Sequence, residues 1–414
     1  MESRVNYYGK IFPVKFERAI GEVLIDENNK EYLDFFSGAG ALNYGHNHPE
    51  LAQNVKSFLE QNYIIHSLDM NSQIRKEFLD AFKSIILKPR NLDFKIQFPG
   101  PTGTNAVEAA IKIARKATSR TNIIAFTNSF HGMTSMSYAL SGSRDHAQSY
   151  NTADGAIFMP FDQYESETVD SFNYLKKMIE NPGTGFEKPA AIILETIQGE
   201  GGINVASKNW LKKIRDFTSK HQILLIVDDI QMGCGRTGDF FSFENSDIHP
   251  DIVLLSKSLS GFGLPLSMVL LKPEFDLWTP GEYNGTFRSN NLALRTALSS
   301  LNFWKNDSFL LHLSENIKYL KKEISRISQK FDPIVGVRGR GMVWGLEFES
   351  PDLSKQVAED LFNSGVLIET CGPRDEVIKL LPPLNISKEN LKLGLNLLSK
   401  SIQKFCPNRA QLVK

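Results

Sequence analysis

Cysteine is scarce in this chain, which has 414 residues and only three cysteines, Cys234, Cys371 and Cys406. Three widely spaced thiols cannot form a disulfide framework or a zinc cluster, so we expect a reducing compartment such as the cytosol. An excess of charge of either sign is also lacking, because Lys+Arg and Asp+Glu both number 47. A chain without net charge has no global field that would attract nucleic acid or an anionic membrane.

Long uninterrupted hydrophobic runs are lacking as well. The first six residues are mostly polar and contain no apolar core, so we expect no signal peptide. The least charged apolar stretch, residues 252–271, contains Lys257 and two glycines, and it therefore does not predict a membrane span. Hydrophobic residues make up 41% and charged residues 23%, which is typical of a soluble globular protein.

Short apolar runs that alternate with amphipathic segments predict a mainly parallel α/β sheet. The expected strands lie at 95–98, 123–126, 190–194, 223–227 and 252–255, with one further strand–helix unit between 228 and 252. The pattern then changes, which predicts a smaller α+β domain. Its expected elements are a long helix at about 297–330, strands at 342–348, 365–369 and 377–381, and a C-terminal helix.

Lys257 stands just beyond the apolar run at 252–255, before a loop of serines and glycines. An amine at the end of a buried strand is costly unless it has a partner or a task. A desolvated lysine loses its proton more easily and becomes a nucleophile toward carbonyls. The simpler interpretation is a lysine whose stem covers the strand end while its amine reaches water. The other residues expected nearby decide between the two.

Four further residues occupy comparable positions at or just beyond apolar runs or at a helix start. They are Thr104, Phe130, Glu195 and Asp228. Ligands of parallel sheets bind beyond the carboxyl ends of the strands, so we expect these residues to meet Lys257. The helix that starts near Gly103 offers free amides to an anion such as phosphate, although an ordinary capping role for Thr104 is the alternative.

This set of residues suits pyridoxal 5'-phosphate. The cofactor needs an amine for its aldehyde, a carboxylate for its pyridine nitrogen, an anion site and a flat partner for its ring. Lys257 is the expected amine, and Asp228 is the expected carboxylate that keeps the ring nitrogen protonated. Thr104 and its helix start would take the phosphate, Phe130 would cover the ring, and Gln231 could reach the ring hydroxyl.

Two other motifs point to competing sites. Residues 233–238 match G-x-G-x-x-G, but no strand ends directly before the first glycine and no helical pattern follows the last. We therefore expect no dinucleotide site there. His46 and His48 could suggest a metal pair, yet no third ligand stands nearby with suitable spacing, and we expect no metal.

With these motifs in place, the chain resembles the class III (ω-) aminotransferases from about residue 10 to 400. The matching stretches are Phe130-His131-Gly132, Glu195 with Gly199-Glu200-Gly201-Gly202, residues 225–238, the Ser256-Lys257 loop and Gly285-Thr286-Phe287. The resemblance implies the fold-type I pyridoxal phosphate fold and a homodimer. It adds Gly103, His131 and Glu195 to the cofactor site. It also implies that Thr286 reaches the phosphate bound in the partner subunit, the alternative being a capping hydroxyl.

Within this family the likeness is greatest to diaminobutyrate–2-oxoglutarate transaminases of the ectoine-pathway type. The matching stretches are 38–46, 198–206, 228–231, 256–265 and 284–288. The likeness implies transfer of the 4-amino group of L-2,4-diaminobutyrate to 2-oxoglutarate. The alternatives are another ω-amine such as ornithine, lysine or 4-aminobutyrate, an aminomutase or racemase, and a binding protein that kept the fold without catalysis.

Three positions depart from the family pattern. Ser289 stands where the likeness predicts glycine, Met133 where many relatives have an arginine for the distal carboxylate, and Lys379 where many have an arginine for the α-carboxylate. A lysine cannot give the planar two-point grip of arginine. We expect Glu200 and Lys379 to contact the substrate tail, with Lys379 pairing with Glu200 or turning to the acceptor; a solvated strand lysine is the alternative.

The resemblance and the change of pattern together predict three parts of the chain. Residues 1–55 are expected to form an N-terminal segment that joins the small domain. Residues 56–296 would form the large domain that binds pyridoxal phosphate, and residues 297–414 the small C-terminal domain.

Overall fold

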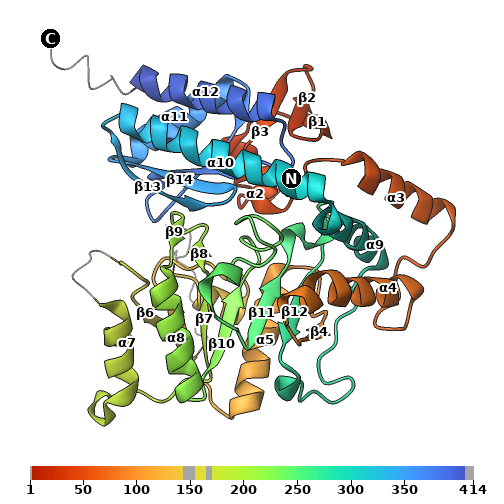
Figure 1. Ribbon diagram of the computed structural model, residues 1–414, viewed down its shortest axis with the longest axis vertical. Coiled ribbons are helices and arrows are strands. Elements are labelled where there is room, and N and C mark those ends of the chain that lie inside the picture. The colour runs from red at the N-terminus through yellow and green to blue at the C-terminus, as the bar shows by residue number, and fades with distance from the viewer. Residues whose placement is uncertain (1, 143–153, 165–169, 406–414) are drawn as a thin grey trace.

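A computed structural model describes residues 2–142, 154–164 and 170–405, and Figure 1 shows them arranged as a lower layer built on a large sheet and an upper layer of smaller sheets and long helices. The large sheet has the order β4-β12-β11-β10-β7-β5-β6. Its strands are β4 (Lys95–Gln97), β5 (Ile123–Phe126), β6 (Ala156–Met159), β7 (Ala191–Leu194), β10 (Leu224–Asp228), β11 (Ile252–Leu255) and β12 (Met268–Leu271). The pairs from β11 to β6 are parallel, while β12 runs antiparallel to both neighbours. The expected mainly parallel α/β fold of type I is confirmed.

The central strands are apolar along their whole length because both faces of the sheet are covered. Successive residues of β7 alternate between two core clusters, so Ile192 packs with Trp210 and Phe217, whereas Ile193 packs with Ala110 and Ile113. The first cluster includes side chains of α8 (Lys208–Lys220), and the second those of α5 (Gly103–Thr118). The sheet is therefore held between helices, and its strand ends open toward the upper layer (Figure 1).

The upper layer combines the two ends of the chain. A four-stranded antiparallel sheet has the order β13-β14-β17-β16, and a second sheet has the order β1-β2-β3-β15, in which N-terminal β3 pairs in parallel with β15. The strands are β1 (Phe16–Ile20), β2 (Val23–Asp26), β3 (Glu31–Asp34), β13 (Ile334–Arg340), β14 (Val343–Phe348), β15 (Val366–Leu367), β16 (Glu369–Cys371) and β17 (Val377–Leu380). Phe35 and Tyr44 share a core cluster with Leu320 and Leu346. The division at residues 55 and 297 stays a prediction.

The remaining elements complete the two layers and the connection between them. The longer helices are α3 (Pro49–Glu60), α4 (Gln73–Ala81), α7 (Ser171–Glu180), α9 (Asn291–Ser300), α10 (Asp307–Lys330), α11 (Pro351–Asn363) and α12 (Lys388–Phe405). The short elements are α1 (Tyr8–Ile11), α2 (Ser37–Gly40), α6 (Ser135–Ala139), β8 (Ile197–Gln198) and β9 (Asn204–Val205). Across the described ranges, no helix combines the length and the apolar character needed to cross a bilayer.

Two expectations about the elements are wrong, and one strand was not predicted. The segment between 228 and 252 is not a strand–helix unit; it is a loop with one 3-10 turn, Glu244–Ser246, whose Phe240, Phe241 and Phe243 anchor it in the core. The helix expected at 297–330 is divided: α9 ends at Ser300, a 3-10 helix spans Leu301–Lys305, and α10 starts after Asn306, which accepts hydrogen bonds from the amides of Ser308 and Phe309. The glycine-containing run 334–340 is strand β13, which the sequence pattern did not predict.

Candidate functional site

A cavity of about 340 Å³ lies beyond the carboxyl ends of β5, β7, β10 and β11. It is lined by Thr102, Gly103, Thr104, Phe130, His131, Gly132, Met133, Glu195, Glu200, Asp228, Ile230, Gln231, Met232 and Lys257. The structure thus brings together most of the residues that the strand ends and motifs singled out. Thr286 and Lys379 are not part of this lining.

Lys257 leaves the sheet in a strained conformation. Its backbone φ is +49°, in the left-handed region that side-chain-bearing residues seldom adopt, and such strain concentrates at functional sites. The Nζ atom donates a hydrogen bond to the carbonyl oxygen of Ala39 at 3.0 Å. Burial lowers the pKa of the Lys257 amine, which favours the nucleophilic neutral form. The amine lines the cavity, so the interpretation of a lysine reaching bulk water is wrong.

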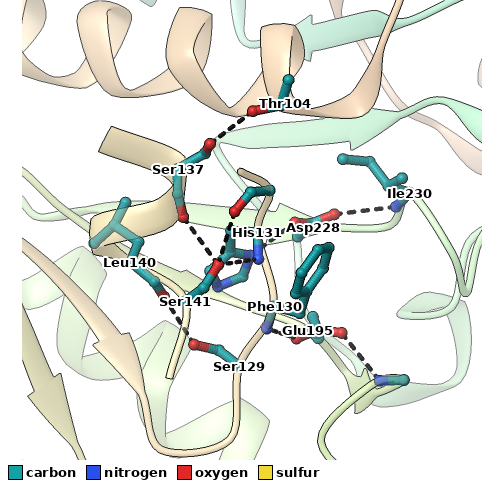
Figure 2. A network of polar contacts seen from close by, with 12 residues as sticks. Thr104, Ser129, Phe130, His131, Ser137, Leu140, Ser141, Glu195, Asp228 and Ile230 are labelled. Atoms are coloured by element: carbon teal, nitrogen blue, oxygen red, sulfur yellow. Dashed lines mark hydrogen bonds and ion pairs between the residues drawn. The ribbon is translucent and has the colours of Figure 1, made fainter. Parts of the chain in front are cut away.

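Asp228 ends β10 and is held from two sides. Its Oδ2 lies 2.7 Å from Nδ1 of His131, and its Oδ1 accepts a hydrogen bond from the amide of Ile230 at 3.2 Å. Figure 2 shows the carboxylate between these two partners, beside the ring of Phe130. Only 4% of the Asp228 side chain is exposed. A fixed, buried carboxylate at the cavity wall can bind a protonated ring nitrogen and keep its charge in place.

Thr104 stands in the first turn of α5 and does not cap it. Thr102 is the N-cap residue and forms a capping box with Asn105, so the capping interpretation of Thr104 is wrong. The Thr104 hydroxyl is 2.6 Å from Ser137 Oγ, and the Ser141 hydroxyl donates to the main-chain carbonyl of the same Ser137 (Figure 2). With Gly103 beside it, this helix start presents free amides and a hydroxyl to the cavity, as an anion site requires.

Gly132 permits the close packing of this phosphate-sized corner. Its φ is +127°, and a Cβ atom there would lie 2.6 Å from the Thr104 hydroxyl oxygen. Any larger residue would displace Thr104. Each residue of the motif Phe130-His131-Gly132 therefore has its own role. Phe130 places its ring beside the cavity, His131 contacts Asp228, and Gly132 leaves room for the Thr104 hydroxyl.

Glu195 holds two loops at the back of the cavity. Its Oε1 accepts a hydrogen bond from the Phe130 amide at 3.0 Å, and its Oε2 accepts one from the Gly199 amide at 3.1 Å. Burial, together with the nearby negative charge of Asp228, raises the pKa of Glu195 to about 7. Both oxygens are occupied by the protein's own backbone, so Glu195 sets the position of Phe130 relative to the cavity.

Gln231 leaves one polar atom without a partner inside the cavity wall. Its Nε2 donates to the Ala39 carbonyl and to Glu200 Oε1, both at 2.9 Å. Its Oε1 is buried and has no hydrogen-bond partner in the described protein. An acceptor that is costly to leave unpaired fits a ligand hydroxyl at this point. Amine, carboxylate, anion corner, aromatic ring and free acceptor thus all fit pyridoxal 5'-phosphate.

Glu200 and Lys379 form an ion pair at one side of the cavity, as the sequence had led us to expect. Lys379 Nζ lies 2.8 Å from Glu200 Oε1, and no part of the lysine side chain is exposed, whereas 28% of the Glu200 side chain is. The interpretation of Lys379 as a solvated strand lysine is therefore wrong. Burial alone would raise the pKa of Glu200, but the charges of Lys379 and Lys257 lower it to about 2.

Sequence reasoning missed a second carboxylate on Lys379. Glu369 Oε1 lies 2.8 Å from the same Nζ, and its Oε2 accepts a hydrogen bond from the Tyr8 hydroxyl at 3.3 Å. Burial raises the pKa of Glu369 to about 7, against the lowering effect of Lys379. The available signal was a glutamate within the otherwise apolar strand region 366–371, two residues after Leu367.

The other departures from the family pattern lie outside this cluster. Ser289 has a left-handed φ of +52° and is buried, so it adopts the conformation that the expected glycine would favour. In the same loop, the carbonyl of Thr286 lies 2.9 Å from Nε2 of His66. Met133 lines the cavity with 64% of its surface exposed.

The two competing motifs serve the fold. In the segment 233–238, Arg236 is fully buried and donates hydrogen bonds to Asn43, Met342 and Pro382. His46 Nε2 lies 3.0 Å from Asp34 Oδ2. Among the residues that the structure describes, no group of three histidine, cysteine or carboxylate side chains is arranged to hold a metal ion.

Comparisons with known proteins agree with this geometry. The family model for class III aminotransferases matches residues 5–402. The chain is 49% identical over 405 residues to a diaminobutyrate–2-oxoglutarate transaminase of Oceanobacillus iheyensis, covering 97% of this chain and 95% of the relative. It is 48% identical over 406 residues to an uncharacterised aminotransferase of Sinorhizobium fredii, covering 97% and 90%.

Solved structures share the fold over nearly the whole chain. A transaminase from a marine Virgibacillus superposes with a TM-score of 0.86 at 20% identity, covering 98% of this chain and 96% of that one. The ornithine aminotransferase of Toxoplasma gondii gives a TM-score of 0.83 at 26% identity, covering 95% and 91%. The chain therefore belongs to the class III aminotransferases, and it is an enzyme that uses pyridoxal 5'-phosphate to move an amino group from an amino donor to a 2-oxo acid.

Proposed function

We propose that the enzyme transfers the 4-amino group of L-2,4-diaminobutyrate to 2-oxoglutarate, giving L-aspartate 4-semialdehyde and L-glutamate, in a reversible reaction. The observation that carries this proposal is the identity of 46–49% with several diaminobutyrate–2-oxoglutarate transaminases, each matched over 97% of this chain. The ion pair of Glu200 and Lys379 beside the cavity supports it, because a diaminobutyrate tail carries both an ammonium and a carboxylate.

The residues of the cavity divide the chemical work. The bound cofactor supplies the aldehyde that receives the amino group and the ring that accepts the electron pair of the breaking C–H bond. Lys257 would be the base that takes the proton from C4 of the donor and delivers it to the cofactor carbon that carries the transferred nitrogen. Asp228, oriented by His131, holds the ring nitrogen protonated. Thr104 and the α5 start bind the phosphate, and Phe130 covers the ring.

Glu200 and Lys379 are proposed to recognise the tails of the two substrates. Glu200 reaches the cavity and meets the α-ammonium of the donor, while Lys379 stands behind it as the cation for an acceptor carboxylate. Met133 has no charge, so the carboxylates of 2-oxoglutarate must be held without an arginine at that position. The pathway implied by the likeness is ectoine formation, which would draw on diaminobutyrate made by the reverse reaction.

A second chain is proposed to complete the site. Thr286 lies away from the cavity of its own chain, in a loop next to an exposed apolar stretch that includes Tyr63, Ile64 and Met70. Large exposed apolar patches are typical of subunit interfaces, and a homodimer would bring Thr286 to the partner's phosphate. The buried free thiols of Cys234 and Cys371 suit a reducing cytosol.

A panel of amino donors with 2-oxoglutarate tests the substrate assignment. Diaminobutyrate should give the highest kcat/KM in a comparison with ornithine, lysine and 4-aminobutyrate. If one of the other three exceeds it, the substrate assignment is wrong while the transaminase assignment stands. Turnover that consumes no 2-oxo acid would instead indicate an aminomutase or racemase.

A further inference from the structure

Lys379 contacts two carboxylates beside the cavity. It donates a hydrogen bond to Glu200, whereas its contact with Glu369 is an ion pair without hydrogen-bond geometry. Lys379 Nζ lies 2.8 Å from both Glu200 Oε1 and Glu369 Oε1. Glu369 and Lys379 are directly opposite each other on the antiparallel strands β16 and β17. The register of the sheet therefore fixes this pair, independently of any ligand.

Glu369 is held on its far side as well. The Tyr8 hydroxyl of α1 donates to Glu369 Oε2 at 3.3 Å, and only 5% of Glu369 is exposed. Glu369 does not line the cavity. Its two oxygens thus contact Lys379 and the Tyr8 hydroxyl and do not face the cavity lining.

Glu200 is the exchangeable partner. It lies on the loop after β8, lines the cavity and receives a second hydrogen bond from Gln231. Its side chain is 28% exposed, compared with none of Lys379. A ligand ammonium that enters the cavity can therefore reach Glu200 before any other member of the cluster.

Resting on the proposed function, we propose that Glu369 is a positioning residue that keeps Lys379 paired while Glu200 gives its charge to the α-ammonium of the donor. A buried lysine with one carboxylate would lock that carboxylate, because separating them leaves an uncompensated buried charge. With Glu369 in place, Lys379 retains a counter-charge when Glu200 turns away. The second carboxylate thus allows the ion pair between Lys379 and Glu200 to open without leaving the lysine unpaired.

The test separates the two halves of the reaction in the holoenzyme. Glu369→Gln removes the charge and keeps the shape, so Glu200 should remain on Lys379. The reaction with the donor is followed in single turnovers through the absorbance of the cofactor. The kcat/KM for diaminobutyrate should fall by about tenfold or more, because losing a charge interaction worth one pKa unit changes an equilibrium constant tenfold. The same constant for 2-oxoglutarate should change by less than about twofold, because the acceptor needs the lysine and not a free Glu200.

Two comparisons show whether the α-ammonium is the group that matters. Ornithine, which carries an α-ammonium, should lose as much as diaminobutyrate, whereas 4-aminobutyrate, which carries none, should lose little. The dissociation constant of glutarate, an unreactive dicarboxylate, should stay the same or decrease when measured by calorimetry. If ornithine proves the better donor, the substrate assignment fails and the proposal for Glu369 is tested in the same way with ornithine.

Control variants keep the experiment informative if Glu369→Gln does not fold. Glu323→Gln removes a carboxylate that pairs with Arg326 within α10 and does not line the cavity, and it should change neither half-reaction. Tyr8→Phe and Glu369→Asp should lower the diaminobutyrate constant in the same direction, by a smaller factor. An equal loss for diaminobutyrate and 4-aminobutyrate, an equal loss in both halves, no loss at all, or a wild type that accepts only 4-aminobutyrate would overturn the proposal.

Discussion

Replacing Arg236 by methionine should destabilise the protein more than any surface charge change, because one buried guanidinium joins three distant segments. Arg236 is fully buried and donates to Asn43 Oδ1 at 2.6 Å, to the Met342 carbonyl at 3.1 Å and to the Pro382 carbonyl. Burial lowers the pKa of its guanidinium to about 9, against the raising effect of Asp34. The guanidinium of Arg236 therefore stays charged at neutral pH, although its removal from water costs free energy.

The expected loss follows from the groups left behind. Hydrogen bonds to a charged group contribute about 1.5–3 kcal/mol each, so three would give about 4.5–9 kcal/mol. Removing the buried charge returns part of this, because the desolvation of the guanidinium no longer has to be offset. We expect a net loss of about 3–5 kcal/mol in the free energy of unfolding, because three buried oxygens lose their donor and each such group costs about 1–3 kcal/mol.

Guanidinium-induced unfolding, followed by tryptophan fluorescence and circular dichroism at one protein concentration, measures this loss. Arg326→Met is the matched control, since Arg326 is half exposed and pairs only with Glu323 in its own helix; it should cost less than about 0.5 kcal/mol. A variant of Arg236 within about 1 kcal/mol of wild type would refute the claim that this side chain holds the layers together.

Other predictions concern the cavity and the subunit contact. Borohydride reduction followed by peptide mapping should label Lys257, and a label on another lysine would contradict its assignment. Asp228→Asn should keep the fold and slow the reaction by about 10⁴-fold, as is seen when a carboxylate that orients a catalytic group in another enzyme is replaced by its amide. Turnover within tenfold of wild type would be inconsistent with this role. Sedimentation should show a dimer whose dissociation releases cofactor, which a fully active monomer would disprove. Ser289→Gly should stabilise the fold by about 1 kcal/mol, because it relieves a left-handed backbone, and chemical unfolding that shows no gain would count against strain at this residue.

The residues at the strand ends could be predicted from the sequence because a buried parallel strand leaves a clear pattern. Four or five apolar residues in a row, followed by a carboxylate or an amine, locate both the strand and the edge where its ligand binds. Glu195, Asp228 and Lys257 all follow this pattern and all line the cavity. The register that brings them together is a property of the parallel sheet, so no pairwise information was needed.

Loops gave weaker signals. The segment between 228 and 252 has strand-like apolar residues, yet its three phenylalanines fill the core from a loop, and side-chain burial alone does not distinguish the two. The break at Asn306 was hidden because the helical pattern resumes after one capping residue. Arg236 looked like part of a nucleotide motif, and only the positions of Asn43 and Pro382 show that the motif packs two layers.

The pairing of Glu369 with Lys379 could not be predicted, because it depends on which strands of the small domain are neighbours and in what register. The two lie ten positions apart in the chain, and a turn between β16 and β17 sets them opposite each other. The third member, Glu200, comes from the other layer and lies 179 positions away from Lys379 in sequence.

The lysine at position 379 is best understood together with its two carboxylates. An arginine offers several donors in a plane and can hold a carboxylate at two points, while a lysine is a compact point charge with three donors. Placed between Glu200 and Glu369, that point charge is paired on two sides without a ligand. Under the proposed roles, Glu200 turns away from Lys379 when it meets the α-ammonium of the donor, and Glu369 then keeps the buried lysine paired.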